Sequence, residues 1–201
     1  MKIILISPPD YIENESSLTN RMFKYNLPLF HLRKPDSSIE NLAEYLNSIK
    51  QEYHSRIVIH SCYNLLENYN LRGIHITGVN SDEKRSIIEQ FKKRYDLSIS
   101  ISYHSLDDLG RNNTGIDYAF LSPAFDSISK RDYKAHFNHK DLAVAVKGSK
   151  IDVIALGGCR GEYLKKIKKM GFAGAAFLGA VWNSSDPVKN FLSIMGNDEN
   201  L

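Results

Sequence analysis

The chain has 201 residues, of which 42% are hydrophobic and 24% charged, as is typical of a globular protein rather than a disordered one. Lys and Arg number 26 against 23 Asp and Glu, and this net charge of +3 is too small to indicate nucleic-acid binding. Two cysteines exclude a disulfide scaffold, and no apolar run reaches the roughly 18–20 residues of a membrane span. We expect a cytoplasmic protein without a nucleic-acid or membrane partner.

The N-terminal segment predicts a β-strand rather than a signal peptide. Its apolar run, Ile3–Ile6, is short and is followed by Ser7-Pro8-Pro9, which is typical of a turn.

Eight short apolar runs follow one another along the chain, each bounded by Gly, Pro, Ser or Asn. Most are continuous rather than alternating, as in strands of a parallel sheet that are buried on both faces. The expected strands are Lys2–Ser7, Leu27–Arg33, Arg56–His60, Gly73–Thr77, Leu97–Tyr103, Asp117–Ser122, Asp152–Leu156 and Gly174–Gly179.

Helical patterns occupy the segments between these runs. Ser37-Ser38-Ile39-Glu40 forms a capping-box pattern at the start of a helix that we expect to reach Tyr53. Further helices are expected after caps at Ser81 or Asp82 and at Asn138, over Glu162–Met170, and over Pro187–Met195. Shorter helical segments are expected at Thr19–Tyr25, Tyr63–Asn68 and Leu106–Leu109.

About eight strand–helix units predict an α/β fold, namely a compact (β/α)₈ TIM barrel of parallel strands. No linker rich in Pro, Gly or Ser divides the chain, so we expect one domain over residues 1–201. A flavodoxin-like sheet would leave the last units unexplained.

In such a barrel the active site lies at the C-terminal ends of the strands. Four of the seven histidines fall there: His31, His60, His75 and His104. Arg33 emerges from an apolar strand and needs a partner, for which an anionic ligand is suitable.

Small residues follow the last two expected strands, where barrels commonly bind phosphate. Gly157-Gly158 and Gly179 let backbone N–H groups approach an anion closely, although a Gly-Gly pair alone is more often a tight turn. Ser127, Ser129 and Lys130 lie in the loop after the sixth strand and offer two hydroxyls and a cation, although a solvated loop is the simpler interpretation.

Several of these segments occur in the order and spacing of one family. They are Phe30-His31-Leu32-Arg33, Gly73-Ile74-His75, Ser102-Tyr103-His104-Ser105, Ser122-Pro123 with the loop through Ser127, Ser129 and Lys130, and Ala155-Leu156-Gly157-Gly158. On these segments the chain resembles thiamine phosphate synthase and its relative, the TenI-type thiazole tautomerase, over nearly its whole length.

The resemblance implies two alternative enzymatic activities. The synthase joins a thiazole phosphate to an aminopyrimidine pyrophosphate and uses Mg²⁺. Its Asn-Asp pair after strand 3 falls on His60 and Ser61, a later Asp falls on or near Asn80, and a Lys falls on Pro35 beside Lys34. Since Mg²⁺ prefers carboxylate oxygens, the metal half of a synthase site looks degraded.

The tautomerase moves one proton on a thiazole carboxylate phosphate and needs no cofactor. The resemblance places its catalytic acid–base on His104, because imidazole both takes and returns a proton near neutral pH. It also implies phosphate binding by Gly157, Gly158 and Gly179, with Arg33, His31, His60, Ser102, Ser127, Ser129 and Lys130 around the substrate. Synthases often carry a histidine in the same stretch, so the distinction rests on the missing carboxylates.

We therefore expect an enzyme of thiamine biosynthesis that acts on a small thiazole phosphate, in the first place as a tautomerase. The alternatives are a synthase with a rebuilt Mg²⁺ site and a catalytically silent barrel that binds thiazole or thiamine phosphate. Family members often self-associate, so a homo-oligomer is compatible with the resemblance. A zinc site at the four strand-end histidines is the lesser alternative, because nothing fixes their geometry and no close pair shows ligand spacing along the chain, so we expect no metal ligands. We interpret His75 as a satisfied residue of the core or as one that supports a site residue.

Overall fold

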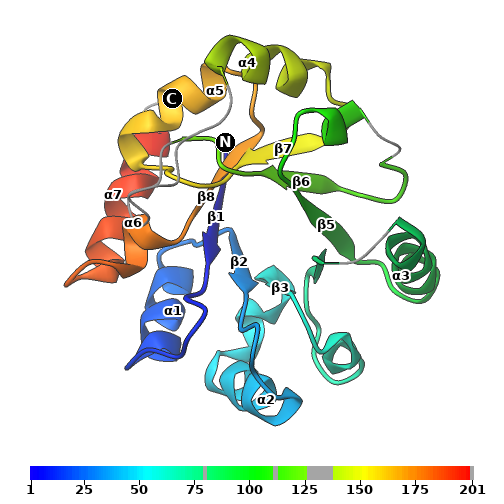
Figure 1. Ribbon diagram of the computed structural model, residues 1–201. Coiled ribbons are helices and arrows are strands. Elements are labelled where there is room, and N and C mark those ends of the chain that lie inside the picture. Colours follow the sequence, from blue (N-terminus) through cyan, green and yellow to red (C-terminus); the bar gives the residue numbers. More distant parts are fainter. Residues whose placement is uncertain (79–80, 111–112, 126–137, 200–201) are drawn as a thin grey trace.

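Eight parallel strands close into a barrel in the computed structural model, which describes residues 1–78, 81–110, 113–125 and 138–199 (Figure 1). Each strand pairs with its neighbour in sequence, and β8 pairs with β1. All eight expected strands are present, and the expected (β/α)₈ barrel is confirmed. The strands are β1 Lys2–Ile6, β2 Leu29–Leu32, β3 Ile57–Ile59, β4 Gly73–Ile76, β5 Ser98–Tyr103, β6 Tyr118–Leu121, β7 Asp152–Ala155 and β8 Gly174–Phe177.

Helices surround the barrel on its outside, with α3 at one edge beside β5 (Figure 1). Within the described chain the α-helices are α1 Glu15–Lys24, α2 Ile39–Ser48, α3 Ser81–Arg94, α4 His139–Gly148, α5 Leu164–Lys169, α6 Gly179–Trp182 and α7 Pro187–Glu199. Short 3₁₀ helices are η1 Gln51–Arg56, η2 Tyr63–Glu67, η3 Asp107–Gly110 and η4 Gly161–Tyr163. None of these helices combines the length and the apolarity needed to cross a membrane.

The helix boundaries correct two details of the sequence-based expectation. Ser38, not Ser37, caps α2, because its hydroxyl accepts from the backbone N–H of Asn41 at 3.2 Å. The helix ends at Ser48 rather than reaching Tyr53, because Ile49 adopts extended backbone angles before η1. The cap expected at Asn138 is confirmed, since its side chain accepts from the N–H of Lys140.

Alternate residues of each strand face different environments. One set, including Ile3, Leu5 and Phe30, belongs to the large core between the strands and the helices. The other set faces the inside of the barrel and forms a second, separate cluster. Its buried members are Ile4, Ile6, Tyr118, Phe120, Ile154 and Ala176. These apolar members come from β1, β6, β7 and β8, so they fill only one side of the interior.

The other side of the interior is polar. Register places His31 of β2 opposite Ile6 and Val58, and His75 of β4 opposite Ser100. His31 and His75 are fully buried. Burial lowers the pKa of His75 to about 3 and that of His31 well below its ordinary 6.5. The imidazoles inside the barrel are therefore neutral at physiological pH.

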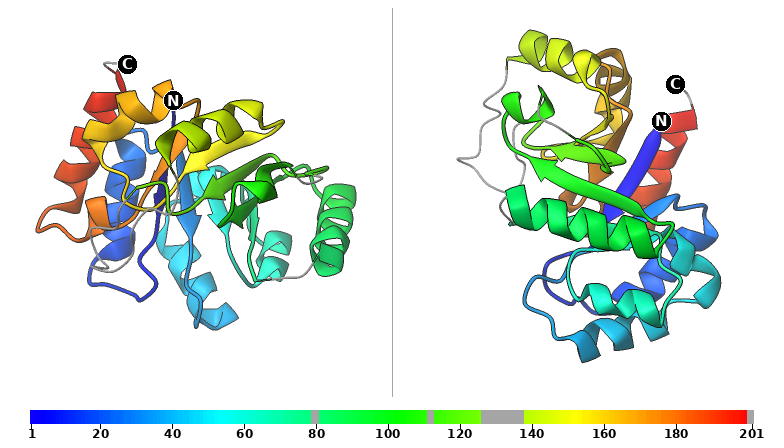
Figure 2. Two further views of the ribbon diagram at one scale, coloured as in Figure 1. Left: turned by 45° about the horizontal axis from the view of Figure 1, so that its top comes forward. Right: turned by 90° about the vertical axis from the view of Figure 1, so that its right-hand side faces the viewer.

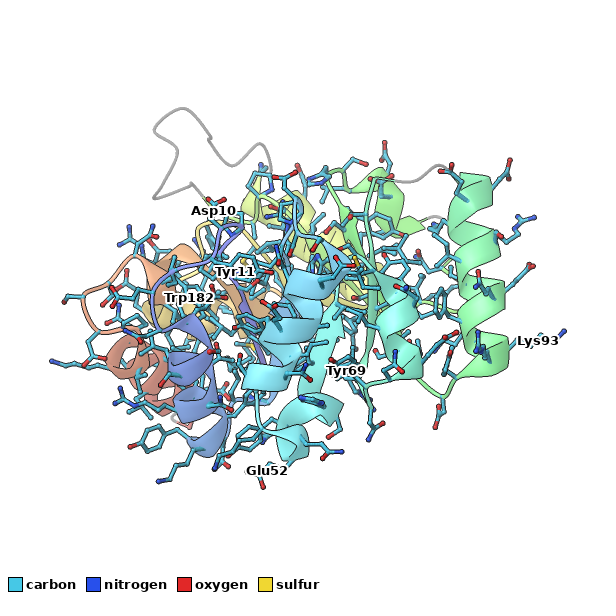
Figure 3. All side chains as sticks on the ribbon, turned by 90° about the horizontal axis from the view of Figure 1, so that it is seen from below. Asp10, Tyr11, Glu52, Tyr69, Lys93 and Trp182 are labelled. Atoms are coloured by element: carbon cyan, nitrogen blue, oxygen red, sulfur yellow. The ribbon has the colours of Figure 1, made fainter. Side chains whose placement is uncertain are left out.

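A buried ion pair fixes the segment after β1. Lys34 Nζ donates to Glu15 Oε2 at 2.7 Å and also to the carbonyls of Pro8 and Asp10, and both charged side chains are almost fully buried. Tyr11 covers this pair, with its ring 4.5 Å from Lys34 Nζ, and Figure 3 shows Tyr11 against α2. The β1–α1 connection is thereby held against the end of β2.

The described chain starts and ends on the same side of the barrel. The N-terminal amine lies 3.4 Å from the Asp198 carboxylate of α7, and both views of Figure 2 place the two ends near each other. The helix α7 packs against α1, α6 and η4.

The buried pair predicts a strong dependence of one partner on the other. Lys34→Met leaves an uncompensated buried carboxylate at Glu15 and should lower the free energy of unfolding by about 3–5 kcal/mol. The double variant Glu15→Leu/Lys34→Met removes both charges and should recover most of that loss. Urea unfolding of the wild type, the single variant and the double variant measures this, and equal stability of the two variants would contradict it.

The buried histidines predict that stability falls below neutral pH. An unfolded chain protonates its histidines near pH 6.5, whereas His75 stays neutral in the fold until about pH 3. Between these values the unfolded state binds more protons, so this contribution is complete above pH 6.5 and is lost as the pH falls. Each such histidine adds a slope of up to about 1.4 kcal/mol per pH unit.

The matched variant His75→Gln should therefore show a shallower loss of stability between pH 6.5 and 4.5 than the wild type. Urea unfolding across this range, with EDTA present so that no cation contributes, gives both slopes. An unchanged slope in a variant with native circular dichroism would contradict the assignment.

Candidate active site

Three histidines from consecutive strands meet at the C-terminal end of the barrel. One ring nitrogen from each of His31, His60 and His75 lies within 4.8 Å of the other two. His31 Nδ1 and His60 Nε2 are 2.9 Å apart, and the His60 ring stacks on that of His75 with 4.3 Å between centroids. His60 follows β3 and is half-buried, so it forms the outer face of this three-histidine cluster.

Hydroxyl groups hold the two inner rings. His31 Nε2 is 2.6 Å from the Tyr118 hydroxyl, and His75 contacts Ser100 Oγ at 2.8 Å and Ser102 Oγ at 2.9 Å. His75 is therefore satisfied, as its sequence motif suggested. In contrast, His60 Nδ1 is buried without a hydrogen-bond partner among the residues that the structure describes.

The cluster is neutral for several reasons that act together. Burial is the main cause that lowers the pKa of His60, followed by the neighbouring His75 and His31 and then by the charge of Arg33. Burial and Arg33 likewise lower the pKa of His75. Arg33 itself is exposed after β2, where its backbone N–H donates to Ser7 Oγ at 2.8 Å. The permanent charge of Arg33 thus disfavours protonation of His60 and His75.

His104 lies apart from this cluster. It follows β5, its side chain is exposed, and its Nδ1 is 3.2 Å from the backbone oxygen of Ser122. A carbonyl oxygen only accepts, so Nδ1–H is the donor in this contact, and in a neutral imidazole the lone pair is then on Nε2. The structure therefore brings together three of the four strand-end histidines and leaves the fourth as a separate, exposed imidazole at the same end of the barrel.

The loops after β6 and β7 contact each other closely. Gly157 and Gly158 both adopt positive φ, at 85° and 66°. A Cβ on Gly157 would lie 3.1 Å from both Pro123 Cα and Ser122 Oγ, so this position requires glycine. Phe125 N donates to the Gly157 carbonyl. Gly179 opens the one-turn helix α6, whose Trp182 Nε1 donates to the Ile6 carbonyl at 2.8 Å.

Among the described residues, those that the resemblance places in the metal half of a synthase site include no carboxylate. Neither His60 nor Ser61, which follow β3, carries a carboxylate. The Lys34 amine already donates to Glu15 and to two backbone carbonyls. These donors are imidazole and hydroxyl groups rather than the carboxylates that Mg²⁺ prefers. Asn80 lies outside the described residues, as do Ser127, Ser129 and Lys130.

Sequence reasoning missed the hydroxyl partners of the cluster, except Ser102. The signal that could have identified them is the alternation along β5 and β6. Ser98, Ser100 and Ser102 recur at every second position of β5, so they lie on one face of that strand. Ser100 pairs in register with His75 of β4, so this is the same face of the sheet. Tyr118 begins β6 in the same layer. The sequence alone predicts no metal ligands, because the histidines lack ligand spacing along the chain. Such spacing is not needed when neighbouring strands bring the residues together.

Known proteins share this fold and sequence pattern. The sequence model of a family described as thiamine monophosphate synthase matches residues 3–181. A thiamine phosphate pyrophosphorylase from Bacteroides thetaiotaomicron is 29% identical with a TM-score of 0.81, covering 99% of this chain and 98% of that one. A thiamine phosphate pyrophosphorylase from Pyrococcus furiosus is 16% identical with a TM-score of 0.79, covering 99% of this chain and 96% of that one, and it supports the fold alone.

Among curated proteins, a thiamine-phosphate synthase of Lactococcus lactis is 23% identical over 150 residues, which are 74% of this chain and 67% of the relative. Another, from Leuconostoc citreum, is 25% identical over 147 residues, which are 72% of this chain and 68% of the relative. The family match covers more than half of the chain and agrees with the closed eight-stranded barrel. The chain therefore belongs to the thiamine monophosphate synthase (TMP-TENI) family.

Proposed function

We propose that this protein is a TenI-type thiazole tautomerase, which isomerises a thiazole carboxylate phosphate by moving one proton. The observation that carries the proposal is the contact between the exposed His104 ring and the Ser122 carbonyl. Its Nδ1–H donates to the Ser122 carbonyl at 3.2 Å, which leaves the Nε2 lone pair available as a base. A base that is exposed at the barrel mouth can remove a proton from one substrate atom and return it to another.

The substrate's anionic groups have suitable partners at the same end of the barrel. Backbone N–H groups at Gly157, Gly158 and the start of α6 at Gly179 would receive the phosphate. Arg33 would pair with the carboxylate. The isomerisation leaves the atoms and the net charge of the substrate unchanged, so the reaction requires neither a leaving group nor a cofactor.

The first prediction concerns His104. His104→Ala should lower the rate of isomerisation by about 10²–10⁴-fold, because it removes the proposed proton shuttle. Binding of thiazole phosphate should persist, because His104 does not hold the phosphate. Turnover is followed by NMR of the two tautomers, and binding by isothermal titration calorimetry. Unchanged turnover in the variant would exclude this mechanism.

A synthase is the second candidate, because the curated relatives carry that name. Its substrates would be thiazole phosphate and an aminopyrimidine pyrophosphate with Mg²⁺. The residues around β3 argue against it, since Ser61 replaces a carboxylate and Lys34 is occupied by Glu15.

We expect no thiamine phosphate when the protein is incubated with both synthase substrates and Mg²⁺. A thiamine phosphate signal that disappears with EDTA would instead establish the synthase. If neither reaction occurs while thiazole phosphate or thiamine phosphate still raises the melting temperature, the protein is a silent binding barrel.

A further inference from the structure

The three-histidine cluster has the composition of a transition-metal site. Its three potential ligands are imidazole nitrogens of His31, His60 and His75, which lie within 4.8 Å of one another. Nitrogen ligands suit Zn²⁺ and Co²⁺, whereas Mg²⁺ and Ca²⁺ prefer oxygen. Imidazole must be neutral to ligate, and burial already keeps these rings neutral.

We propose that His31, His60 and His75 bind a single Zn²⁺ ion inside the mouth of the barrel. Three protein nitrogens with one open position is the ligand number of many reactive zinc sites. Zn–N bonds of about 2.0–2.1 Å in a tetrahedron place the nitrogens about 3.4 Å apart. The present separations of up to 4.8 Å therefore need only a small inward turn of the rings.

We infer that His60 is the ring that turns. Its ring stacks on His75 with an interplanar angle of 29°, an arrangement in which the two rings do not point at a common centre. His60 is half-buried at the mouth, and its Nδ1 has no partner within the described chain. Rotation of this ring costs no hydrogen bond at Nδ1 and exchanges the 2.9 Å contact with His31 for a shared ligand.

The hydroxyls around the cluster complete the design. Metal-bound histidines usually hydrogen-bond through their other ring nitrogen, which orients the ring. Tyr118 supplies this contact to His31 Nε2 at 2.6 Å, and Ser100 supplies it to His75 Nδ1 at 2.8 Å. His31 Nδ1 and His75 Nε2 are thereby left for the ion, with Ser102 giving up its contact with His75 Nε2.

Arg33 favours an anion at the open position. It lies two residues after His31, just beyond β2, so its permanent charge opposes a bare dication at the cluster. An anionic fourth ligand, such as hydroxide or a carboxylate, would be attracted by both the ion and the guanidinium. The inference goes beyond the tautomerase proposal, because proton transfer by His104 does not involve this ion.

Zinc binding is tested on the full chain after treatment with EDTA and removal of the chelator. Calorimetric titration with ZnCl₂ should give one site per chain, and CoCl₂ should give the visible absorption of a four-coordinate ion. His60→Gln and His75→Gln should each weaken Zn²⁺ binding by at least about 100-fold. Tyr118→Phe, which removes only the hydroxyl beside His31, should weaken it by about tenfold.

His104→Ala is the matched control, because it removes an imidazole from the same end of the barrel but from outside the cluster. Its Zn²⁺ affinity should equal that of the wild type. Circular dichroism and melting temperature show which variants fold. His60→Gln is decisive because that side chain is half-buried and, within the described chain, hydrogen-bonds to one partner, His31. Absence of stoichiometric binding in the wild type, or wild-type affinity in folded His60→Gln, would overturn the proposal.

Binding of zinc and isomerisation of the thiazole are separate measurements, so either proposal can fail while the other stands. The alternative to zinc binding is that the three histidines serve only as a hydrogen-bonded polar layer in the barrel. This alternative predicts a lower melting temperature for the histidine variants and no binding of Zn²⁺ by the wild type.

Discussion

Closure of the parallel sheet is the constraint on which the rest of the structure depends. It forces alternate residues of every strand into a narrow interior that the surrounding helices cannot fill. On β1, β6, β7 and β8 this interior is occupied by apolar side chains such as Ile4 and Phe120. On β2, β4 and β5 it holds histidine and serine side chains, which find partners in one another and in Tyr118 of β6, while β3 contributes the apolar Val58. Three histidines that are far apart in the sequence therefore come into contact.

The strands could be predicted because their apolar runs are long enough to stand out from the intervening segments. The polar interior could not be predicted as completely, because a continuous apolar run hides which residues face inward. His31 and His75 each sit within such a run, and only the register of neighbouring strands places them in one layer. The cap of α2 shows the same limit on a smaller scale, since Ser37 and Ser38 are equally good caps by composition.

Lys34 has the charge expected of a substrate-binding residue, but its amine is buried and already hydrogen-bonded. By alignment it stands next to a lysine position of the synthase site. In the fold its amine donates to Glu15, Pro8 and Asp10 and is covered by Tyr11. Glu15 lies on α1, far from Lys34 in the sequence, so the residues around Lys34 do not predict this ion pair. This cation therefore organises the loop after β1, and Arg33 remains as the exposed cation beside it.

Tyr118, His31 and His60 form a line of hydrogen bonds, with 2.6 Å and 2.9 Å between successive atoms. Only two proton arrangements satisfy both neutral imidazoles. In one, the Tyr118 hydroxyl donates to His31 Nε2 and His31 Nδ1–H donates to His60 Nε2. In the other, His60 Nε2–H donates to His31 Nδ1 and His31 Nε2–H donates to the Tyr118 oxygen. The three groups therefore change their hydrogen-bond directions together, between these two arrangements. Any group that engages the outer nitrogen of His60 selects the orientation of a hydroxyl buried on β6.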